Sequence, residues 1–392
     1  MHAPTKEYFK KLEVNMKVVI AAAGTGGHIN PGIAIANKIK KENKNAQITF
    51  IGTSRGLEND LVPRAGYKLK QIEAYGINRK ISLQNFKNMI KTLQSFKTAK
   101  KIIKEIKPDL VIGTGGYICG PTILAAKKYK IPTMLHESNA FPGMSVKLLA
   151  NKVDTVLVGF EDAKTRLTRA KKVVVTGTPS KIKKVQLTKQ QQEEVKKQYD
   201  IKNNLPIVLI FGGSQGAKSI NNALIDIIQN KLNTNYQIIW AVGQKQYDIV
   251  RETLKSIGLN INNIDNTKIV PYIYNMEDVM NLADLIIARS GAMTITEVAK
   301  VGKPAIFIPF PFATENHQEY NAKVLQNVGA AKIILDKDLN KDVLNNEILE
   351  IINDSEKMKK MGKNAEKIDI NDVEERIYKE IQKNVRKTVD KM

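Results

Sequence analysis

The chain has 392 residues, of which 42% are hydrophobic and 26% charged, and its net charge at pH 7 is +23. This length predicts two domains, and this composition excludes an intrinsically disordered chain. No apolar run reaches the ~18 residues of a membrane-spanning helix, which excludes an integral membrane protein. The single cysteine, Cys119, excludes a disulfide framework and is typical of a reducing compartment. The positive charge favours an anionic partner: a nucleic acid, a membrane or a phosphorylated substrate.

The first half of the chain alternates strand-like and helix-like segments. Residues 1–15 lack an apolar core and are predicted to be an extension, because Met16 directly precedes the first strand-like run. Strands are predicted at residues 17–23, 47–52, 68–74, 109–112, 131–135, 153–158 and 172–175. Strands alternating with helices form βαβ units, which build a parallel sheet with helices on both faces. We therefore predict a first domain over residues 16–179.

A second alternating series follows a polar stretch at residues 180–204. Strands are predicted at residues 206–211, 236–241, 267–270, 284–288, 304–308 and 331–334. These define a second domain over residues 180–370. Residues 371–392 are predicted to be an amphipathic helix, with packing against the first domain as one option, because apolar residues recur at steps of four: Val373, Ile377, Ile381, Val385 and Val389. The fold class is therefore α/β, with two Rossmann-like domains whose ligands bind beyond the carboxyl ends of the strands.

Three glycine-rich loops follow predicted strands, at Gly24–His28, Gly113–Tyr117 and Gly212–Ala217. Such a loop exposes backbone N–H groups to an anion, and a following helix adds the positive end of its dipole. After the first loop, a helix is predicted from Ile33 to Lys41. The spacing of the glycines matches neither the dinucleotide-binding fingerprint nor the nucleoside triphosphate P-loop. The three loops together predict a phosphate or pyrophosphate ligand.

A fourth candidate segment is Arg289–Glu297, which follows a predicted strand and opens a helix. First-turn N–H groups and the Thr294 hydroxyl are suited to phosphate oxygens. Glu297 lies one turn further along, where a carboxylate can accept hydrogen bonds from a ribose diol. A charge that complements the helix dipole is the alternative interpretation of Glu297.

Three of the four histidines fall near the ends of predicted strands: His28, His136 and His317. His136 begins a polar run that reaches Asn139, and His317 precedes Gln318. Polar residues at the carboxyl ends of parallel strands are expected to face the ligand. No pair of histidines has metal-ligand spacing, so no bound metal is predicted.

Together these motifs resemble the MurG family of glycosyltransferases. The resemblance rests on Gly24–His28, Gly115–Tyr117, His136–Glu137, Gly212–Gly216, Arg289–Gly291 and Glu297, and it extends from about Met16 to residue 365. It implies the GT-B fold and an inverting transfer of N-acetylglucosamine (GlcNAc) from UDP-GlcNAc to the N-acetylmuramic acid (MurNAc) 4-hydroxyl of undecaprenyl-linked lipid I. The product is lipid II of peptidoglycan, and the resemblance implies no cofactor and no obligatory metal.

The resemblance also implies which residues contact the substrate. Lys181 stands where the family has an arginine, so it keeps the charge but loses the bidentate fork. The residues that correspond to the UDP-GlcNAc site are Thr25, Gly26, Gly27, Asn139, Lys181, Ser214, Gln215, Ile273, Ala292, Met293, Thr294, Ile295, Thr296, Glu297 and Gln318.

The transfer requires a general base for the attacking hydroxyl and positive dipoles for the departing diphosphate. His28, an imidazole beside the first glycine loop, is our candidate for the base. Glu137 is the second candidate. The alternative interpretation of His28 is a residue that caps or structures the loop.

Residues 79–107 predict contact with a membrane, because nine Lys or Arg and one Glu accompany an amphipathic apolar stripe. The predicted membrane residues are Ile81, Phe86, Met89, Ile90, Leu93 and Phe96. The expected location is the cytoplasmic face of the cell membrane, with the enzyme bound peripherally. A helix whose stripe packs in the core is the alternative.

Three other functions remain open at this stage. One is a UDP-sugar:diacylglycerol glycosyltransferase, and another is a UDP-GlcNAc 2-epimerase, which would need no membrane surface. A nucleic-acid-binding protein is disfavoured, because no stripe of the sequence interleaves aromatic residues with lysines on a known module.

Overall fold

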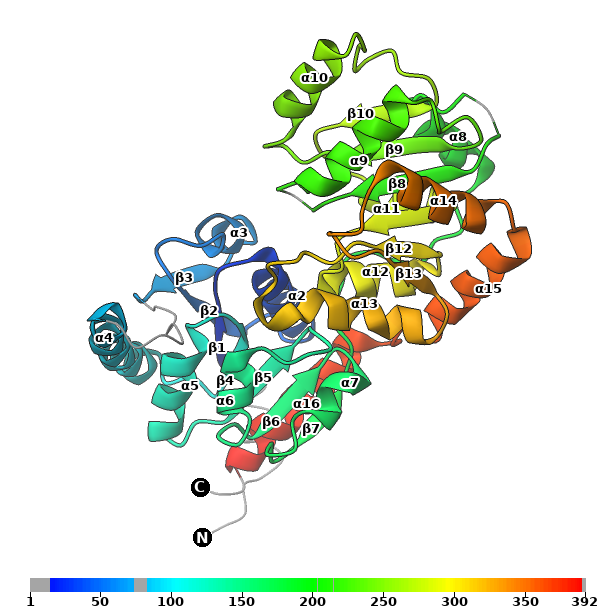
Figure 1. Ribbon diagram of the computed structural model, residues 1–392. Helices are drawn as coiled ribbons and strands as arrows, with labels where there is room; N and C mark the ends of the chain where they lie inside the picture. The colour runs from blue at the N-terminus through cyan, green and yellow to red at the C-terminus, as the bar shows by residue number, and fades with distance from the viewer. Residues whose placement is uncertain (1–14, 74–82, 203, 214, 390–392) are drawn as a thin grey trace. The chain divides into compact units, whose positions relative to one another are not determined.

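The computed structural model describes residues 15–73, 83–202, 204–213 and 215–389, without the side chains of residues 83–93 and 387–389. The chain divides into two compact units (Figure 1). Unit 1 comprises Met1–Pro179 and Ile370–Met392, and unit 2 comprises Ser180–Asp369. Each unit contains one sheet, and every strand pair in both sheets is parallel.

The sheet of unit 1 has seven strands in the order β3-β2-β1-β4-β5-β6-β7. Their bounds are β1 (Lys17–Ala22), β2 (Gln47–Gly52), β3 (Lys68–Gln71), β4 (Leu110–Gly115), β5 (Thr133–Glu137), β6 (Thr155–Val158) and β7 (Val173–Val175). Each of the seven strands predicted for the first half of the chain is therefore confirmed, with bounds that differ by up to three residues.

Helices cover both faces of this sheet. Their bounds are α2 (Gly26–Glu42), α3 (Glu58–Arg64), α4 (Leu83–Ile106), α5 (Cys119–Lys128), α6 (Met144–Leu149), α7 (Glu161–Thr165) and α16 (Val373–Val389). Successive side chains of a strand point to opposite faces. Val18 and Ile20 of β1 accordingly pack in a core with residues of α2 and α16, whereas Val19 and Ala21 pack in a second core with residues of α4 and α5.

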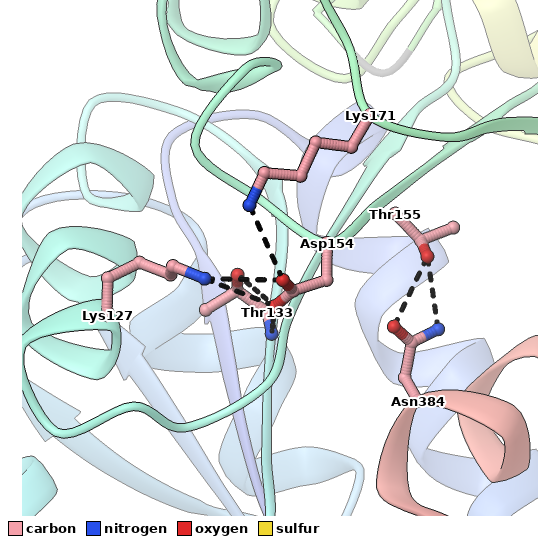
Figure 2. Close-up of polar contacts among 6 residues, drawn as sticks. All are labelled: Lys127, Thr133, Asp154, Thr155, Lys171 and Asn384. Atoms are coloured by element: carbon pink, nitrogen blue, oxygen red, sulfur yellow. Dashed lines mark hydrogen bonds and ion pairs between the residues drawn. The ribbon is translucent and has the colours of Figure 1, made fainter. Parts of the chain in front are cut away.

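The C-terminal helix α16 belongs to unit 1 because its apolar stripe is buried there. Val373, Ile377, Ile381 and Val385 join the core that contains β1 and α2. Figure 2 shows a polar contact of the same helix, in which the Asn384 amide nitrogen donates to Thr155 Oγ1 at 3.1 Å. The helix thus closes one face of a sheet whose strands lie more than 190 residues earlier in the sequence.

Asp154, the residue before Thr155, connects β5 with α5, which covers the other face of the sheet from α16 (Figure 2). The Thr133 backbone N–H donates to its Oδ2 at 2.9 Å, and Lys127 Nζ of α5 lies 3.3 Å from its Oδ1. Burial alone would raise the pKa of Asp154, but these partners outweigh burial and lower it.

The sheet of unit 2 has six strands in the order β10-β9-β8-β11-β12-β13. Their bounds are β8 (Ile207–Phe211), β9 (Gln237–Ala241), β10 (Thr267–Val270), β11 (Leu285–Ala288), β12 (Ala305–Phe307) and β13 (Ala331–Ile333). The helices are α8 (Lys189–Gln198), α9 (Lys218–Gln229), α10 (Tyr247–Ser256), α11 (Met276–Leu282), α12 (Ala292–Val301), η1 (Thr314–Asn316), α13 (His317–Asn327), α14 (Lys341–Ile352) and α15 (Ser355–Glu366). All six predicted strands are confirmed.

The first helix starts earlier than the sequence predicts. The sequence indicates a start at Ile33, because three glycines and Pro31 disfavour helix, but α2 begins at Gly26. Ile29 and Ile33 are one turn apart and both are buried in the core of unit 1. This burial outweighs the weak local propensity, as tertiary packing commonly does. His28 therefore lies in the first turn of a helix.

Candidate functional site

His28 is held at both its side chain and its backbone. Its Nδ1 lies 3.0 Å from the Ala23 carbonyl oxygen, which can only accept a hydrogen bond. The proton of the neutral ring is therefore on Nδ1, and Nε2 is the basic nitrogen. Thr114 Oγ1 in β4 donates to the His28 carbonyl oxygen at 2.8 Å. The imidazole thus has a fixed tautomer and is half-buried beside the end of β4.

The second glycine loop forms the surface against which the His28 ring packs. A Cβ atom at Gly115 would lie 2.2 Å from His28 Cδ2 and 2.9 Å from Nε2. The backbone φ of Gly115 is +137°, a value that side-chain-bearing residues rarely adopt. The pairing of β1 with β4 shifts register between Ala21 and Ala22, which brings Gly115 opposite Ala22. The first two glycine loops therefore form one structure around His28.

The first turn of α2 offers backbone donors beside this histidine. Thr25 is the N-cap residue, with extended backbone dihedrals, and Gly26 and Gly27 follow it. N–H groups of the first helical turn have no acceptor within the helix. Because Thr25 and Gly27 are exposed, this helix start is suited to hydrogen-bond acceptors of a ligand.

A buried carboxylate fixes the start of this loop. Glu58 is fully buried, and its Oε2 accepts a hydrogen bond from the Gly24 N–H at 2.9 Å. Its Oε1 accepts from the backbone N–H of Thr53 at 2.8 Å and from the hydroxyl of the same residue at 2.6 Å. Burial would raise the pKa of Glu58, but these hydrogen bonds outweigh burial and lower it. Sequence reasoning missed Glu58, because its partner Gly24 lies 34 residues away.

Glu137 holds the turn that follows β5. Its Oε1 accepts hydrogen bonds from the backbone N–H and the side-chain amide of Asn139, both at 2.9 Å. Its Oε2 accepts from the Gly143 N–H at 2.7 Å. Both oxygens therefore engage donors of the same turn, and the carboxylate orients Asn139.

The expectation that His136 faces a ligand is wrong. Only 1% of the residue is exposed, and its Nε2 donates to the Gly177 carbonyl oxygen at 3.1 Å. Burial lowers the pKa of His136 to about 4, so the ring is neutral at physiological pH. The alternation of side chains along β5 turns this residue into the interior of unit 1 and leaves it a structural group.

In unit 2, the candidate phosphate segment forms the start of α12. Gly291 is its N-cap residue, with extended dihedrals, and Ala292 is the first helical residue. Thr294 is half-buried, Ile295 is a core residue, and the Thr296 hydroxyl donates to the Ala292 carbonyl oxygen at 3.0 Å. This segment therefore offers backbone N–H groups and the Thr294 hydroxyl to a ligand, while the side chains of Ile295 and Thr296 anchor the helix.

Glu297 lies one turn further along α12 and accepts a hydrogen bond from the Ser180 hydroxyl at 3.1 Å. Burial raises the pKa of Glu297 to about 7, and the Ser180 hydrogen bond offsets part of that effect. Among the described residues, no cation forms an ion pair with this carboxylate. The residue is half-buried, and a carboxylate whose pKa is raised by its surroundings is typical of functional sites.

The other predicted donor-site residues of unit 2 lie in separate segments of the chain. Gln318 Oε1 accepts a hydrogen bond from the Phe310 N–H at 2.9 Å. Ile273 is buried between Tyr272 and Tyr274, whose rings stack edge to face at 5.0 Å between centroids. Lys181 and Gln215 are exposed, Met293 is half-buried, and Ser214 lies outside the described residues.

The predicted membrane residues fall mostly outside the described part of the chain. Ile81 lies outside the described residues, and so do the side chains of Phe86, Met89, Ile90 and Leu93. Phe96 is half-buried and packs on the core of unit 1 that contains α5. The C-terminal part of α4 therefore uses its apolar stripe in the core.

Within the described part of the chain, no group of three or more His, Cys, Asp or Glu side chains is placed to hold a metal ion. The described helices include none with the length and hydropathy of a membrane span.

Comparison with known proteins adds to this geometry. Residues 18–158 match the glycosyltransferase family 28 N-terminal domain, and residues 207–377 match the glycosyltransferase family 28 C-terminal domain. The chain is 43% identical over 374 residues to the UDP-N-acetylglucosamine–N-acetylmuramyl-(pentapeptide) pyrophosphoryl-undecaprenol N-acetylglucosamine transferase of Acetivibrio thermocellus. That match covers 94% of this chain and 99% of the relative.

Solved structures of other proteins share the fold of this chain. The crystal structure of Acinetobacter baumannii MurG matches with a TM-score of 0.74 and 29% identity, covering 94% of this chain and 99% of that one. A UDP-GlcNAc 2-epimerase from Neisseria meningitidis, bound to UDP-GlcNAc, matches with a TM-score of 0.63 and 17% identity, covering 94% and 100%. At that identity the second likeness shows the fold alone.

Proposed function

Because this chain belongs to glycosyltransferase family 28 and to its MurG members, we propose that it transfers GlcNAc from UDP-GlcNAc to the MurNAc 4-hydroxyl of lipid I. The product is lipid II, and the anomeric configuration is inverted. The observation that carries this proposal is the near full-length identity to a transferase of that name, combined with a histidine of fixed tautomer in unit 1. UDP-GlcNAc and an undecaprenyl-linked acceptor are then the two substrates.

In this reaction the acceptor oxygen forms a bond to the anomeric carbon as the bond from that carbon to the diphosphate breaks. UDP departs with the bonding electrons, and the hydroxyl proton passes to a base. We assign that base to His28, since its Nδ1–H donates to Ala23 and leaves Nε2 free to accept the proton. Glu137 is the weaker candidate, because both of its oxygens accept hydrogen bonds from its own turn.

On the donor side, the start of α12 is the proposed diphosphate site. Its first-turn N–H groups and the Thr294 hydroxyl stabilise the negative charge of the leaving group. Glu297 accepts hydrogen bonds from the ribose diol, and Gln318 contacts the sugar hydroxyls. The backbone of Ile273 meets the uracil. The remaining proposed contacts are Thr25, Gly26, Gly27, Asn139, Lys181, Ser214 and Gln215.

The pKa of Glu297 predicts how donor binding depends on pH. A carboxylate accepts hydrogen bonds from a diol more strongly than a protonated carboxyl group does. Because the pKa of Glu297 is about 7, the binding-competent form is lost as the pH falls through 7. We expect the Kd of UDP-GlcNAc to rise about tenfold between pH 8 and pH 6, as titration of one group predicts. Isothermal titration calorimetry measures this Kd.

The matched control for this prediction is Glu297→Gln, which keeps the shape of the side chain and cannot titrate. The Glu297→Gln variant should bind UDP-GlcNAc weakly at every pH, and its Kd should be nearly constant between pH 6 and pH 8. The same pH dependence in the wild type and in Glu297→Gln would assign the titration to another group and contradict the proposed role.

The function itself is tested by supplying UDP-GlcNAc together with a lipid I analogue. Release of UDP that requires this acceptor, and a disaccharide product, is the expected result. Release of UDP with diacylglycerol instead of lipid I would favour the glycolipid synthase. Formation of N-acetylmannosamine without any acceptor would favour the 2-epimerase, whose scaffold is similar.

The lipid-linked acceptor requires contact with a membrane, and we propose that unit 1 binds its cytoplasmic face peripherally. Unit 1 contains 37 lysines and arginines against 17 acidic residues, whereas unit 2 contains 25 against 22. Nearly all of the net charge of +23 therefore belongs to unit 1. A basic surface next to exposed apolar side chains is the usual signature of anionic-membrane binding.

Helices α5 and α6 pack against each other and supply such apolar side chains (Figure 1). Leu148 is 64% exposed, Met144 is 41% exposed and Leu124 is 40% exposed. Lys128 and Lys147 lie on the same two helices. No nucleic acid is needed to explain the charge.

Substitutions on these helices test the membrane proposal. We expect Met144→Ser/Leu148→Ser to weaken binding to vesicles of about 30% phosphatidylglycerol by roughly 30-fold or more, since each buried apolar side chain contributes about 1–2 kcal/mol and about 1.4 kcal/mol corresponds to tenfold. Co-sedimentation measures the bound fraction, which should also fall as salt rises. Ile249→Ser is the control, because Ile249 is 57% exposed but lies in unit 2. A bound fraction that changes neither with salt nor with the double substitution would contradict the proposal.

A further inference from the structure

Arg289 follows β11 directly and would be expected to reach a phosphate, because it adjoins the start of α12. Its side chain is instead 13% exposed and bonded within the protein. Nη1 donates to the carbonyl oxygens of Ile308 at 3.0 Å and Pro309 at 3.1 Å. These carbonyls belong to the turn after β12.

The charge of Arg289 is balanced by Asp336, which follows β13. Nη1 lies 2.5 Å from Asp336 Oδ1, and Nη2 donates to Ser219 Oγ at 2.9 Å. The Ser219 hydroxyl in turn donates to the same Asp336 oxygen at 2.6 Å. The three side chains close a triangle of hydrogen bonds, which we call the Arg289 cluster.

The cluster connects the carboxyl ends of four strands that are neighbours in the sheet. Ser219 is in the first turn of α9, which follows β8, and Arg289 follows β11. Ile308 and Pro309 follow β12, and Asp336 follows β13. The sheet order places β8, β11, β12 and β13 side by side. From its place after β11, one guanidinium group therefore contacts residues that follow β8, β12 and β13.

The turn after β12 also leads to Gln318. Phe310, the next residue after Pro309, donates its N–H to Gln318 Oε1 at 2.9 Å. The guanidinium carbon of Arg289 lies 5.6 Å from the centre of the Phe310 ring. Arg289, three residues before the first residue of α12, therefore contacts the turn that bonds Gln318.

We propose that Arg289 is a positioning residue, which together with Asp336 and Ser219 fixes the start of α12 against the Gln318 turn and so preorganises the UDP-sugar site. This inference rests on the proposed function. Only a planar fork can reach two carbonyls, a hydroxyl and a carboxylate at once, and a lysine ammonium cannot reproduce that geometry. A displacement of about 1 Å in such a site can reduce activity by roughly 100-fold.

The test measures UDP binding to the full chain by calorimetry and the kinetic constants in the transferase assay. We expect Arg289→Lys to raise the Kd of UDP and the KM of UDP-GlcNAc together by roughly 10-fold to 100-fold. The kcat at saturating donor should fall as well, because the start of α12 also stabilises the charge of the departing diphosphate. The double variant Arg289→Lys/Asp336→Asn should bind UDP no more weakly than Arg289→Lys alone, since both substitutions break one cluster.

Asp336→Asn separates positioning from direct phosphate contact. Removing the carboxylate releases Arg289, so an arginine that bound phosphate itself would bind UDP equally well or more tightly. A positioning arginine loses its anchor, and the Kd of UDP should rise by about tenfold. Ser219→Ala is a milder variant that keeps the ion pair and should weaken UDP binding by about threefold.

Lys300 and Asp369 supply the matched control, because they form an ion pair of similar burial near the other end of α12, at 3.9 Å. Lys300→Met should leave the Kd of UDP unchanged. Wild-type UDP binding in Arg289→Lys, or tighter binding in Asp336→Asn, would overturn the positioning role alone. Absence of UDP binding by the wild-type chain would instead overturn the proposed function, and the inference with it.

Discussion

Replacing His28 by alanine is expected to lower kcat by roughly 100-fold to 10,000-fold, the usual contribution of a general base. The Kd of UDP-GlcNAc should stay within about twofold of the wild type, since the proposed donor contacts lie mainly in unit 2. Steady-state kinetics with a lipid I analogue gives kcat, and calorimetry gives the Kd. Loss of a base lowers kcat and leaves the Kd unchanged, whereas loss of a binding residue raises the Kd.

His28→Asn distinguishes the base from a residue that only structures its loop. An asparagine amide occupies the position of Nδ1 and can donate to the Ala23 carbonyl oxygen, as the imidazole does at 3.0 Å. It has no basic nitrogen in the place of Nε2. A kcat as low as that of His28→Ala supports the base. Recovery of most of the wild-type kcat would give His28 a structural role and return Glu137 to consideration.

Gly115→Ala is expected to have the second large effect, although Gly115 touches no proposed substrate group. The new Cβ would lie 2.2 Å from His28 Cδ2, and the backbone would have to keep a φ of +137°. The strained dihedral and the overlap should each cost about 1–3 kcal/mol of unfolding free energy. Relief of the overlap displaces the imidazole, so kcat should fall by roughly 100-fold or more.

Two other glycines of unit 1 separate these causes. Gly66 has a φ of +82°, and a Cβ atom added to it would have nothing within 4 Å, so Gly66→Ala reports the dihedral strain alone. Gly120 lies in α5 with open space around it, so Gly120→Ala reports the methyl group alone. Both variants should keep the wild-type kcat. Urea unfolding measures the stability of all three, and a wild-type kcat in Gly115→Ala would contradict the proposed packing.

Most strands were predictable because they are short apolar runs between turn residues, and a buried parallel strand needs little else. The edge strand β3, with the sequence KLKQ, is the exception. The turns that begin at Gly24 and Gly212 were predictable as well, because glycines closely follow a strand at both places. The fold class follows from these elements alone. The start of α2 was not predictable, since the burial of Ile29 against distant strands outweighs the local preference of its glycines.

The supporting residues of the site could not be predicted in the same way. Arg289 and Asp336 are 47 residues apart, and their ion pair depends on the order of strands in the sheet. The burial of His136 depends on which face of β5 it occupies, and a strand buried on both faces has no polar alternation to indicate this. Motifs therefore predict a binding site, whereas the contacts that hold those motifs in place are visible only in the structure.

The placement of α16 has a consequence for the order of events during synthesis. Residues 180–369 form a continuous unit, whereas unit 1 lacks one of its helices until α16 has left the ribosome. Until then, the face of β1 and α2 that Val373, Ile377 and Ile381 will cover remains exposed to water. Domains generally fold as units while the chain emerges. Unit 2, although second in the sequence, can therefore complete its core first, and the last-made helix finishes the unit that was begun first.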